Sequence, residues 1–398
     1  MKFASITERL SGLGSAKWAV HVRARALRAE GRDIVELTIG EPDVPPVDAL
    51  MEDAATAMRA GRMGYSNGMG EPGLRAALAR RYTSSTGRDI HPDQVMCLPG
   101  TQTSLFTTLM GLVEEGDEVL VGDPMYATYE GCIRASGAAM VPVPLSPDNG
   151  FRMKAADIAV RITPRSRAIL LNTPHNPTGA VLTRDDIREI GEVARKHDLW
   201  IISDEVYEEL IFDGVPFASP LAEADLADRT VVVSSISKSH AAPGFRSGWA
   251  IGSTEFTSHL LSLSETMLFG SQPFLADATA NAVSAPSTVA PGMRQRFAAR
   301  AGYLAARLEN ESALSVSRPQ AGMFALIDIS STGMSAEGYA FDLLENAGVA
   351  VMPGTSFGKT LDTWVRVALT APDAALETAC DRIVAHASAI TASRSAAQ

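Results

Sequence analysis

The sequence predicts a two-domain protein in which a doubly wound α/β domain precedes a smaller α+β domain. The chain has 398 residues, more than one hydrophobic core usually serves. From about residue 94, short runs rich in Val, Ile and Leu alternate with helical patterns, as in "RAILLNTP" followed by "TRDDIREIGEVARKHD". These runs are continuously apolar, which predicts parallel strands covered by helices on both faces. We therefore expect a large doubly wound domain over residues 46–289.

Six apolar runs are expected to form the strands of this domain. In chain order they are "QVMCLPG", "DEVLVGDP", "RAILLNTP", "LWIISDEV", "RTVVVSSIS" and "SGWAIG". Helical patterns separate them, beginning with "TSLFTTLMGLVEEG" after the first strand. In "TRDDIREIGEVARKHD", Thr183 is a suitable N-cap and the apolar residues recur at helical spacing.

Residues 290–398 show a different pattern and predict a small α+β domain. The long amphipathic helix "VAPGMRQRFAARAGYLAARLEN" leads to the strand "GMFALIDIS". A further helix, "SAEGYAFDLLENAG", precedes the strand "TWVRVALT". Strands and helices are thus mixed rather than regularly alternating. Residues 1–45 form an arm, and its helix "KWAVHVRARALRAEG" is expected to pack with the small domain.

Composition and charge exclude several classes of function. A formal net charge of −11 argues against a nucleic-acid partner, which requires a basic face. The N-terminus has no apolar leader, and no apolar run approaches membrane-spanning length. The three cysteines have no metal-ligand spacing, and their odd number favours reduced thiols. We expect a cytoplasmic protein without a membrane partner or a bound metal.

Polar residues follow the predicted strands, where ligands of open α/β sheets bind. Thr101 and Gln102 open a helix whose free N–H groups suit a phosphate, although ordinary helix capping explains them equally well. Tyr126 after the second strand offers an aromatic face, or is a half-buried surface residue. Asn176 after the third faces a ligand or caps a turn. Asp204 after the fourth needs a cationic partner, or caps a helix over "EVYEEL".

The fifth strand is followed by "SSISKSHAAPGFRSGWAIG", which contains Ser235, Lys238 and Arg246. A lysine that is partly desolvated among small residues loses some preference for its charged form. Its neutral amine can then attack a carbonyl to form a Schiff base. A phosphate site, a stacking aromatic, a strand-end carboxylate and a reactive lysine together suit pyridoxal 5′-phosphate (PLP). The pyridine nitrogen of PLP stays protonated beside a carboxylate.

From "LTIGEPD" to "WVRVALT", the chain resembles the class I/II aminotransferases of the aspartate aminotransferase superfamily, which have PLP fold type I with a seven-stranded sheet. The resemblance implies that Lys238 forms the aldimine and shuttles the proton. Asp204 would pair with the pyridine nitrogen, and Tyr207 would bind the ring oxygen. The implied cofactor contacts are Thr101, Gln102, Tyr126, Asn176, Asp204, Tyr207, Ser235, Lys238 and Arg246. Relatives often carry other residues at Thr101 and Gln102, so the individual phosphate contacts are left open.

The same resemblance implies a homodimer and a substrate site. Tyr65 would reach the phosphate of the neighbouring subunit's cofactor. Gly40 and Arg366 would hold the α-carboxylate of the amino acid, with Asn176 also touching substrate, because the planar guanidinium suits a carboxylate. Without the resemblance, Arg366 is better explained by an interior salt bridge. Trp18 would form a wall of the substrate site or pack its helix against the small domain.

The expected donor is a long neutral, aromatic or cationic amino acid, arginine included, with pyruvate or 2-oxoglutarate as acceptor. No lysine or arginine lies between Arg246 and Arg294. One group of aspartate aminotransferases has a second arginine in the region that here reads "MLFGSQPF". The stretches "PMYATYE", "SPDNGFR", "TPHNPTGA" and "SKSHA" resemble members that use arginine and pyruvate. Lys17 remains a possible partner for acidic substrates.

Other functions stay open at this point. An aspartate aminotransferase, or a PLP-dependent lyase or synthase on the same fold, would share the cofactor contacts. A PLP-sensing transcriptional regulator would need a DNA-binding domain, and no segment before residue 40 of this acidic chain fits one. Incubation with an L-amino acid separates the enzymes, because only a transaminase accumulates the pyridoxamine form and releases a 2-oxo acid.

Overall fold

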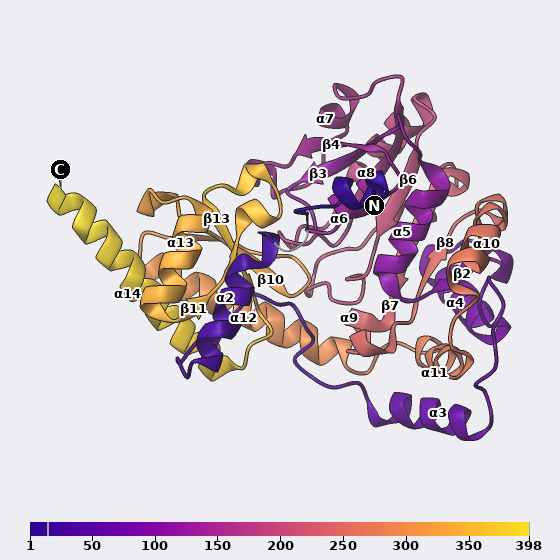
Figure 1. Ribbon diagram of the computed structural model, residues 1–398, viewed down its shortest axis with the longest axis horizontal. Coiled ribbons are helices and arrows are strands. Elements are labelled where there is room, and N and C mark those ends of the chain that lie inside the picture. The colour runs from indigo at the N-terminus through magenta and orange to yellow at the C-terminus, as the bar shows by residue number, and fades with distance from the viewer. Residues whose placement is uncertain (14–15, 398) are drawn as a thin grey trace.

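The computed structural model describes residues 1–13 and 16–397 and contains two main sheets (Figure 1). The larger sheet has seven strands in the order β2-β8-β7-β6-β5-β3-β4. Only β8 runs antiparallel to its neighbours, so the sheet is mostly parallel, as predicted. Its strands are β2 (Val95–Leu98), β3 (Glu118–Asp123), β4 (Ala139–Pro144), β5 (Ser166–Asn172), β6 (Trp200–Asp204), β7 (Thr230–Ser235) and β8 (Gly248–Ile251).

Helices cover both faces of this sheet, which explains the continuously apolar strands. On β7, Val231 and Val233 belong to a hydrophobic cluster with α5, whereas Val232 belongs to a cluster with α4 and α11. The predicted cap of α8 is confirmed, since Thr183 and Asp186 form a capping box. The helices of this part are α3 (Asp48–Arg59), α4 (Pro72–Thr86), α5 (Gly100–Leu112), α6 (Tyr129–Ala135), α7 (Ala155–Ala159), α8 (Arg184–Lys196), α9 (Ile236–Ser239), α10 (Thr254–Leu268) and α11 (Pro273–Val283).

Strand β4 is the one strand of the large sheet that the apolar runs do not predict. Its sequence, "AMVPVP", contains Pro142 and Pro144. Proline cannot donate a ladder hydrogen bond and is confined to sheet edges. β4 lies at the edge and pairs only with β3, which accommodates both prolines.

A four-stranded antiparallel sheet, in the order β12-β13-β10-β9, forms the centre of the smaller part. A short parallel pair, β1 with β11, lies beside it. The remaining strands are β1 (Val35–Glu36), β9 (Ser315–Ser317), β10 (Phe324–Asp328), β11 (Val349–Ala350), β12 (Met352–Pro353) and β13 (Trp364–Ala368). The remaining helices are α1 (Ser5–Arg9), α2 (Ala19–Ala29), α12 (Ala290–Glu311), α13 (Ala336–Asp342) and α14 (Asp373–Ala397).

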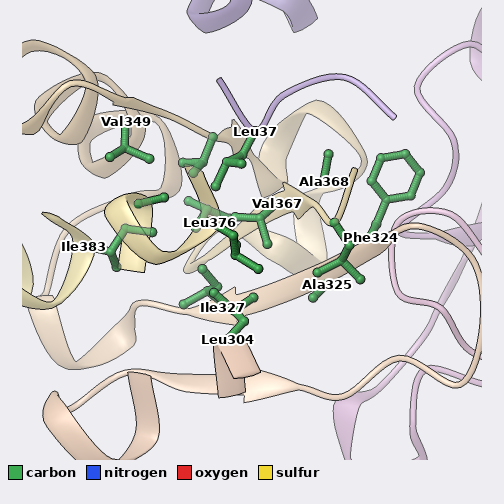
Figure 2. Packing of buried hydrophobic residues seen from close by; sticks show 14 of the residues in the cluster. Leu37, Leu304, Phe324, Ala325, Ile327, Val349, Val367, Ala368, Leu376 and Ile383 are labelled. Carbon is green, nitrogen blue, oxygen red and sulfur yellow. The ribbon is translucent and has the colours of Figure 1, made fainter. Parts of the chain in front are cut away.

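The arm helix α2 packs into the hydrophobic core of this smaller part. Val20, Ala24 and Leu27 are buried in one cluster with residues of α12 and α14. Figure 2 shows the cluster around β10 and β13, with Phe324 at its margin. This packing ties residues 19–29 to the C-terminal part of the chain. The boundaries at residues 45/46 and 289/290 stay a prediction.

The described part of the chain has no membrane-spanning helix, no cluster of metal-ligating side chains and no disulfide. None of its helices is long and apolar enough to cross a lipid bilayer. Its acidic, histidine and cysteine side chains form no group of three or more that would hold a metal ion. Cys97, Cys132 and Cys380 are all buried and free of disulfides.

Candidate active site

One cavity of about 230 Å³ lies at the carboxyl edge of the large sheet, against the smaller part of the chain. Its lining contains every predicted site residue except Tyr65. Those residues are Trp18, Gly40, Thr101, Gln102, Tyr126, Asn176, Asp204, Tyr207, Ser235, Lys238, Arg246 and Arg366.

An anion site lies where α5 begins. Thr101 Oγ1 donates a hydrogen bond to Ser235 Oγ at 2.9 Å. The Arg246 guanidinium donates to two backbone carbonyls, at 2.9 and 3.1 Å, and pairs with no carboxylate of the described residues. Gly100 has φ +81°, which favours glycine, and a Cβ atom there would lie 2.2 Å from Arg246 Nη2 and displace the guanidinium. Free helix N–H groups, two hydroxyls and an unpaired guanidinium suit a phosphate.

The side chain of Gln102 is turned towards α6. Its Nε2 donates to Cys132 Sγ at 3.0 Å, and its Oε1 accepts from Thr128 Oγ1 at 2.8 Å. These bonds engage both ends of the amide. An anion at the start of α5 therefore meets the backbone N–H group of Gln102, which the first turn of the helix leaves free.

Asp204 ends β6 and is buried, 5 % exposed. Its Oδ2 accepts from Tyr129 Oη at 2.7 Å, and its Oδ1 accepts from the Val206 N–H at 3.2 Å. No cationic side chain of the described residues pairs with it, and burial raises the pKa of its carboxyl to about 6. The alternative that Asp204 caps a helix is wrong, because the chain continues in a turn.

Lys238 lies on the short helix α9 and projects its amine into the cavity. Its Nζ donates to the Gly40 carbonyl at 2.7 Å. Burial lowers the pKa of Lys238 to about 8, and the charges of Arg366 and Arg246 act in the same direction. A substantial fraction of the amine is thus neutral near physiological pH, as nucleophilic and base chemistry requires.

Arg366 of β13 is a buried cation, 2 % exposed. Its guanidinium lies 3.9 Å from the centre of the Phe324 ring and 4.3 Å from that of Phe357. Nη1 donates to Asn176 Oδ1 at 3.0 Å and Nη2 to the Thr38 carbonyl at 2.6 Å, while Nε has no partner. It forms no ion pair within the described chain, so the interior salt bridge is wrong. A desolvated cation of this kind calls for an anionic ligand.

Aromatic residues and one glycine shape the rest of the cavity. The Tyr126 ring meets Tyr129 edge to face at 5.6 Å, and Tyr207 meets Phe324 at 6.4 Å. A Cβ atom on Gly40 would lie 2.1 Å from Phe324 Cζ, so this segment approaches the ring only because residue 40 is glycine. Trp18 and Ile39 line the cavity from the arm.

Tyr65 is the one predicted site residue that lies elsewhere. It is 89 % exposed, and its ring contacts Phe269 edge to face at 5.1 Å. It does not line the cavity of its own chain. Its role at the cavity of a second subunit stays a prediction.

Sequence reasoning missed several residues of the site. Tyr129 bonds to Asp204, Asn172 pairs with Asp204 across β5 and β6, and Phe324 covers Arg366. Thr38 contributes a backbone carbonyl, for which residue type gives no signal. Two of them had a usable signal: Asn172 is a polar residue at the end of a predicted strand, and Tyr129 follows Tyr126 by three residues.

Residues 32–383 match the family model described as aminotransferase class I and II. The chain belongs to this family. The aminotransferase is 40% identical to the arginine–pyruvate transaminase AruH of Pseudomonas aeruginosa, over 96% of this chain and 97% of that one. It is 31% identical to an aspartate aminotransferase of Geobacillus stearothermophilus, over 93% and 95% of the two chains.

Solved structures confirm the fold of this aminotransferase as PLP fold type I. Aspartate aminotransferase from Thermus thermophilus with maleate superposes with a TM-score of 0.91 at 30% identity, covering 97% of this chain and 100% of that one. The aspartate aminotransferase from Rhizobium meliloti gives 0.91 at 27% identity, with 98% and 99% covered.

The predicted cofactor is confirmed by the family, whose members use PLP. The residues of the cavity fit such a group. The start of α5 with Arg246 suits its phosphate, and the unpaired buried Asp204 suits its pyridinium nitrogen. Lys238 supplies an amine of lowered pKa for its aldehyde carbon.

Proposed function

We propose that this aminotransferase binds PLP through the residues that line its cavity. Thr101, Ser235, Arg246 and the backbone of Gln102 hold the phosphate, because they form the anion site at the start of α5. Asp204 keeps the pyridine nitrogen protonated.

The remaining cofactor contacts fix the ring. Tyr207 and Asn176 hydrogen-bond its phenolic oxygen, and Tyr126 stacks on it. When bound, PLP supplies an electron sink for the carbon that loses its proton. Lys238 attaches the cofactor covalently and, once released by substrate, moves the proton. Its lowered pKa supports this role, because a catalytic base works best when its pKa lies near the pH of the medium.

The observation that carries the substrate assignment is the buried, unpaired guanidinium of Arg366. With Gly40 and Asn176 it holds the α-carboxylate of the amino acid, since a carboxylate supplies the charge that no residue of the described chain provides. The guanidinium lies over the Phe324 and Phe357 rings and is buried from water.

We propose that the side-chain end of this site does not favour a second carboxylate. The cations that line the cavity are Lys238, Arg246 and Arg366, and each already has a role. Lys17 donates to Glu130 Oε2 at 3.2 Å and to the Ala127 carbonyl, so it is not free to pair with an acidic substrate. A distal carboxylate would be desolvated without a partner.

The walls at this end suit long side chains. Trp18 and Ile39 offer apolar surface, and an indole face also attracts a guanidinium. The relative AruH is named an arginine–pyruvate transaminase, which supports arginine as donor and pyruvate as acceptor. A solved quadruple mutant of the Thermus thermophilus aspartate aminotransferase is complexed with tryptophan, so the shared fold admits a bulky ligand.

We expect arginine, methionine or phenylalanine to exceed aspartate in kcat/KM by at least about tenfold, equivalent to about 1.4 kcal/mol. The measurement is single-turnover conversion of the bound cofactor across a panel of L-amino acids, followed by turnover with pyruvate and 2-oxoglutarate. Trp18→Ala is the matched variant. It should lower kcat/KM for the long donors and leave kcat/KM for the donor L-alanine unchanged. Aspartate ahead by tenfold would refute the side-chain assignment but not the aminotransferase.

We further propose that the enzyme works as a homodimer in the cytoplasm. Met63, Tyr65 and Phe269 are exposed by 67 %, 89 % and 65 %, and such apolar surface is typical of an interface. The family resemblance has Tyr65 reach the neighbouring subunit's cofactor, which requires this surface to face a second copy. The free, buried cysteines suit a reducing compartment.

Complementation between two damaged subunits tests the shared site. Lys238→Ala and Tyr65→Ala each damage both sites of a homodimer. A heterodimer of the two variants contains one site with an intact Lys238 and an intact Tyr65 from its partner. We expect differently tagged, co-purified heterodimers to recover about half the parent activity. No recovery above the Tyr65→Ala homodimer would mean that Tyr65 does not act across the interface.

A further inference from the structure

The arm helix α2 meets the substrate cavity through a hydrogen-bonded triad formed by His21, Glu36 and Thr38. His21 Nδ1 lies 2.6 Å from Glu36 Oε1 and 3.0 Å from Thr38 Oγ1. The Thr38 hydroxyl donates to the same Glu36 oxygen at 3.0 Å. Because a carboxylate only accepts hydrogen bonds, Nδ1 carries a proton in this arrangement. The triad joins α2 to β1 and to the segment that follows it.

Thr38 links this triad to the groups that hold substrate. Its side chain is fully buried, and its carbonyl accepts from Arg366 Nη2 at 2.6 Å. Two residues further on, the Gly40 carbonyl accepts from Lys238 Nζ at 2.7 Å. Residues 38–40 therefore form a strap along the cavity, which Ile39 and Gly40 line. The bonds of the Thr38 hydroxyl hold the strap together with backbone bonds from the Leu37 N–H to the Ala350 carbonyl and from the Ala368 N–H to the Leu37 carbonyl.

The imidazole of His21 also contacts Trp18, a residue that lines the cavity. Its ring meets Trp18 edge to face, with the ring centres 6.4 Å apart. Trp18 precedes α2 directly and lines the cavity. His21 thus contacts Trp18 through its ring and Thr38 through its nitrogen. The mechanism described above assigns no task to His21 or Glu36.

We propose that His21 and Glu36 are positioning residues for substrate, and that their triad with Thr38 sets the distance between the Trp18 wall and the 38–40 strap. This inference rests on the proposed substrate site. A side chain that holds two walls affects how tightly substrate is bound more than how fast a correctly bound substrate reacts. Loss of the triad should weaken the binding of every donor, because the triad positions the α-carboxylate site as well as the side-chain wall.

The chain offers a matched control on the same helix. Arg23 Nε donates to Glu345 Oε1 at 2.6 Å, which ties α2 to the segment after α13. This ion pair is half exposed and does not line the cavity. Arg23→Ala therefore loosens the helix without touching the triad. His21→Asn retains a hydrogen-bonding group close to the position of Nδ1 and serves as the conservative variant.

Hydrogen–deuterium exchange measured without substrate gives the first readout. His21→Ala is expected to speed amide exchange in peptides covering residues 36–40, whereas Arg23→Ala speeds it only in α2 and the segment that Glu345 occupies. His21→Asn should restore slow exchange in residues 36–40. Equal exchange in His21→Ala and the parent, or the same pattern in Arg23→Ala, would overturn the proposal.

Kinetics with arginine and with aspartate give the second readout. For His21→Ala we expect KM to rise about tenfold for both donors while kcat changes less than about threefold, with Arg23→Ala close to the parent. The Glu36→Ala effect should overlap with that of His21→Ala in a double-mutant cycle rather than add to it. Faster exchange in residues 36–40 with an unchanged KM also overturns the inference. Failure of the proposed site itself is seen separately, as an Arg366→Lys variant with an unchanged KM.

Discussion

Replacing Lys238 with alanine is expected to lower kcat by at least about 10⁴-fold, because in the proposed function this side chain supplies both the nucleophile and the base. The cofactor should still bind, since Thr101, Ser235 and Arg246 remain to hold its phosphate. The variant therefore separates cofactor binding from covalent attachment. Phosphate contacts alone are expected to retain PLP more weakly than the parent does.

Borohydride reduction followed by intact-mass measurement detects the attachment directly. The parent should gain the mass of one reduced cofactor, and peptide mapping should place it on Lys238. Lys196→Ala is the matched control, because Lys196 is an exposed lysine at the end of α8, far from the cavity lining. It should behave as the parent. Undiminished turnover of Lys238→Ala, or a tag on another lysine, would refute the assignment.

The sequence predicted the gathering of these side chains because of a geometric rule. The carboxyl ends of neighbouring parallel strands lie at one edge of a sheet, so residues that follow successive strands become neighbours. Asn172 and Asp204 are register partners on β5 and β6, and Ser235 ends β7 beside them. Apolar runs predict where strands end, and residues at the ends of neighbouring strands are then predicted to lie close together.

The errors arose where one local pattern allows two structures. "EVYEEL" has good helix formers, but the chain turns there, and the Val206 N–H bonds to Asp204 as in a turn. The prolines of β4 hid a strand that only an edge position permits. Local residue propensity alone predicts neither the turn after β6 nor the edge position of β4.

The missed contacts depend on tertiary structure. Thr38 holds Arg366 with a backbone carbonyl across 328 residues of sequence, and any residue type supplies such an acceptor. Phe324 and Phe357 lie against Arg366, but buried phenylalanines occur in every hydrophobic core, so the sequence does not single these two out. The role of Tyr65 is not visible within one chain, because its proposed target lies in a second subunit.

Asp204→Asn is expected to slow proton abstraction by at least about 100-fold while leaving the fold intact. Asparagine keeps the shape of the side chain but removes the charge that is proposed to hold the pyridine nitrogen protonated. Tyr129→Phe is the matched variant, since it removes only the hydroxyl that donates to Asp204 Oδ2. We expect it to cost about tenfold, the value of one hydrogen bond to a charged group. The measurement is single-turnover kinetics with an α-deuterated donor.

Thermal unfolding of the cofactor-free protein distinguishes an electronic role from a structural one. Burial raises the pKa of Asp204 from 3.8 to about 6, so the folded state holds a proton that the unfolded chain has already lost between these values. Relative to Asp204→Asn, the parent should therefore lose stability as pH rises from about 4 to about 6, and the difference should then level off. Asp204→Asn lacks this titration and should unfold at an equal or higher temperature at pH 8. If instead it unfolds well below the parent there, the carboxylate stabilises the turn after β6, and the loss of activity reflects folding rather than the charge beside the cofactor.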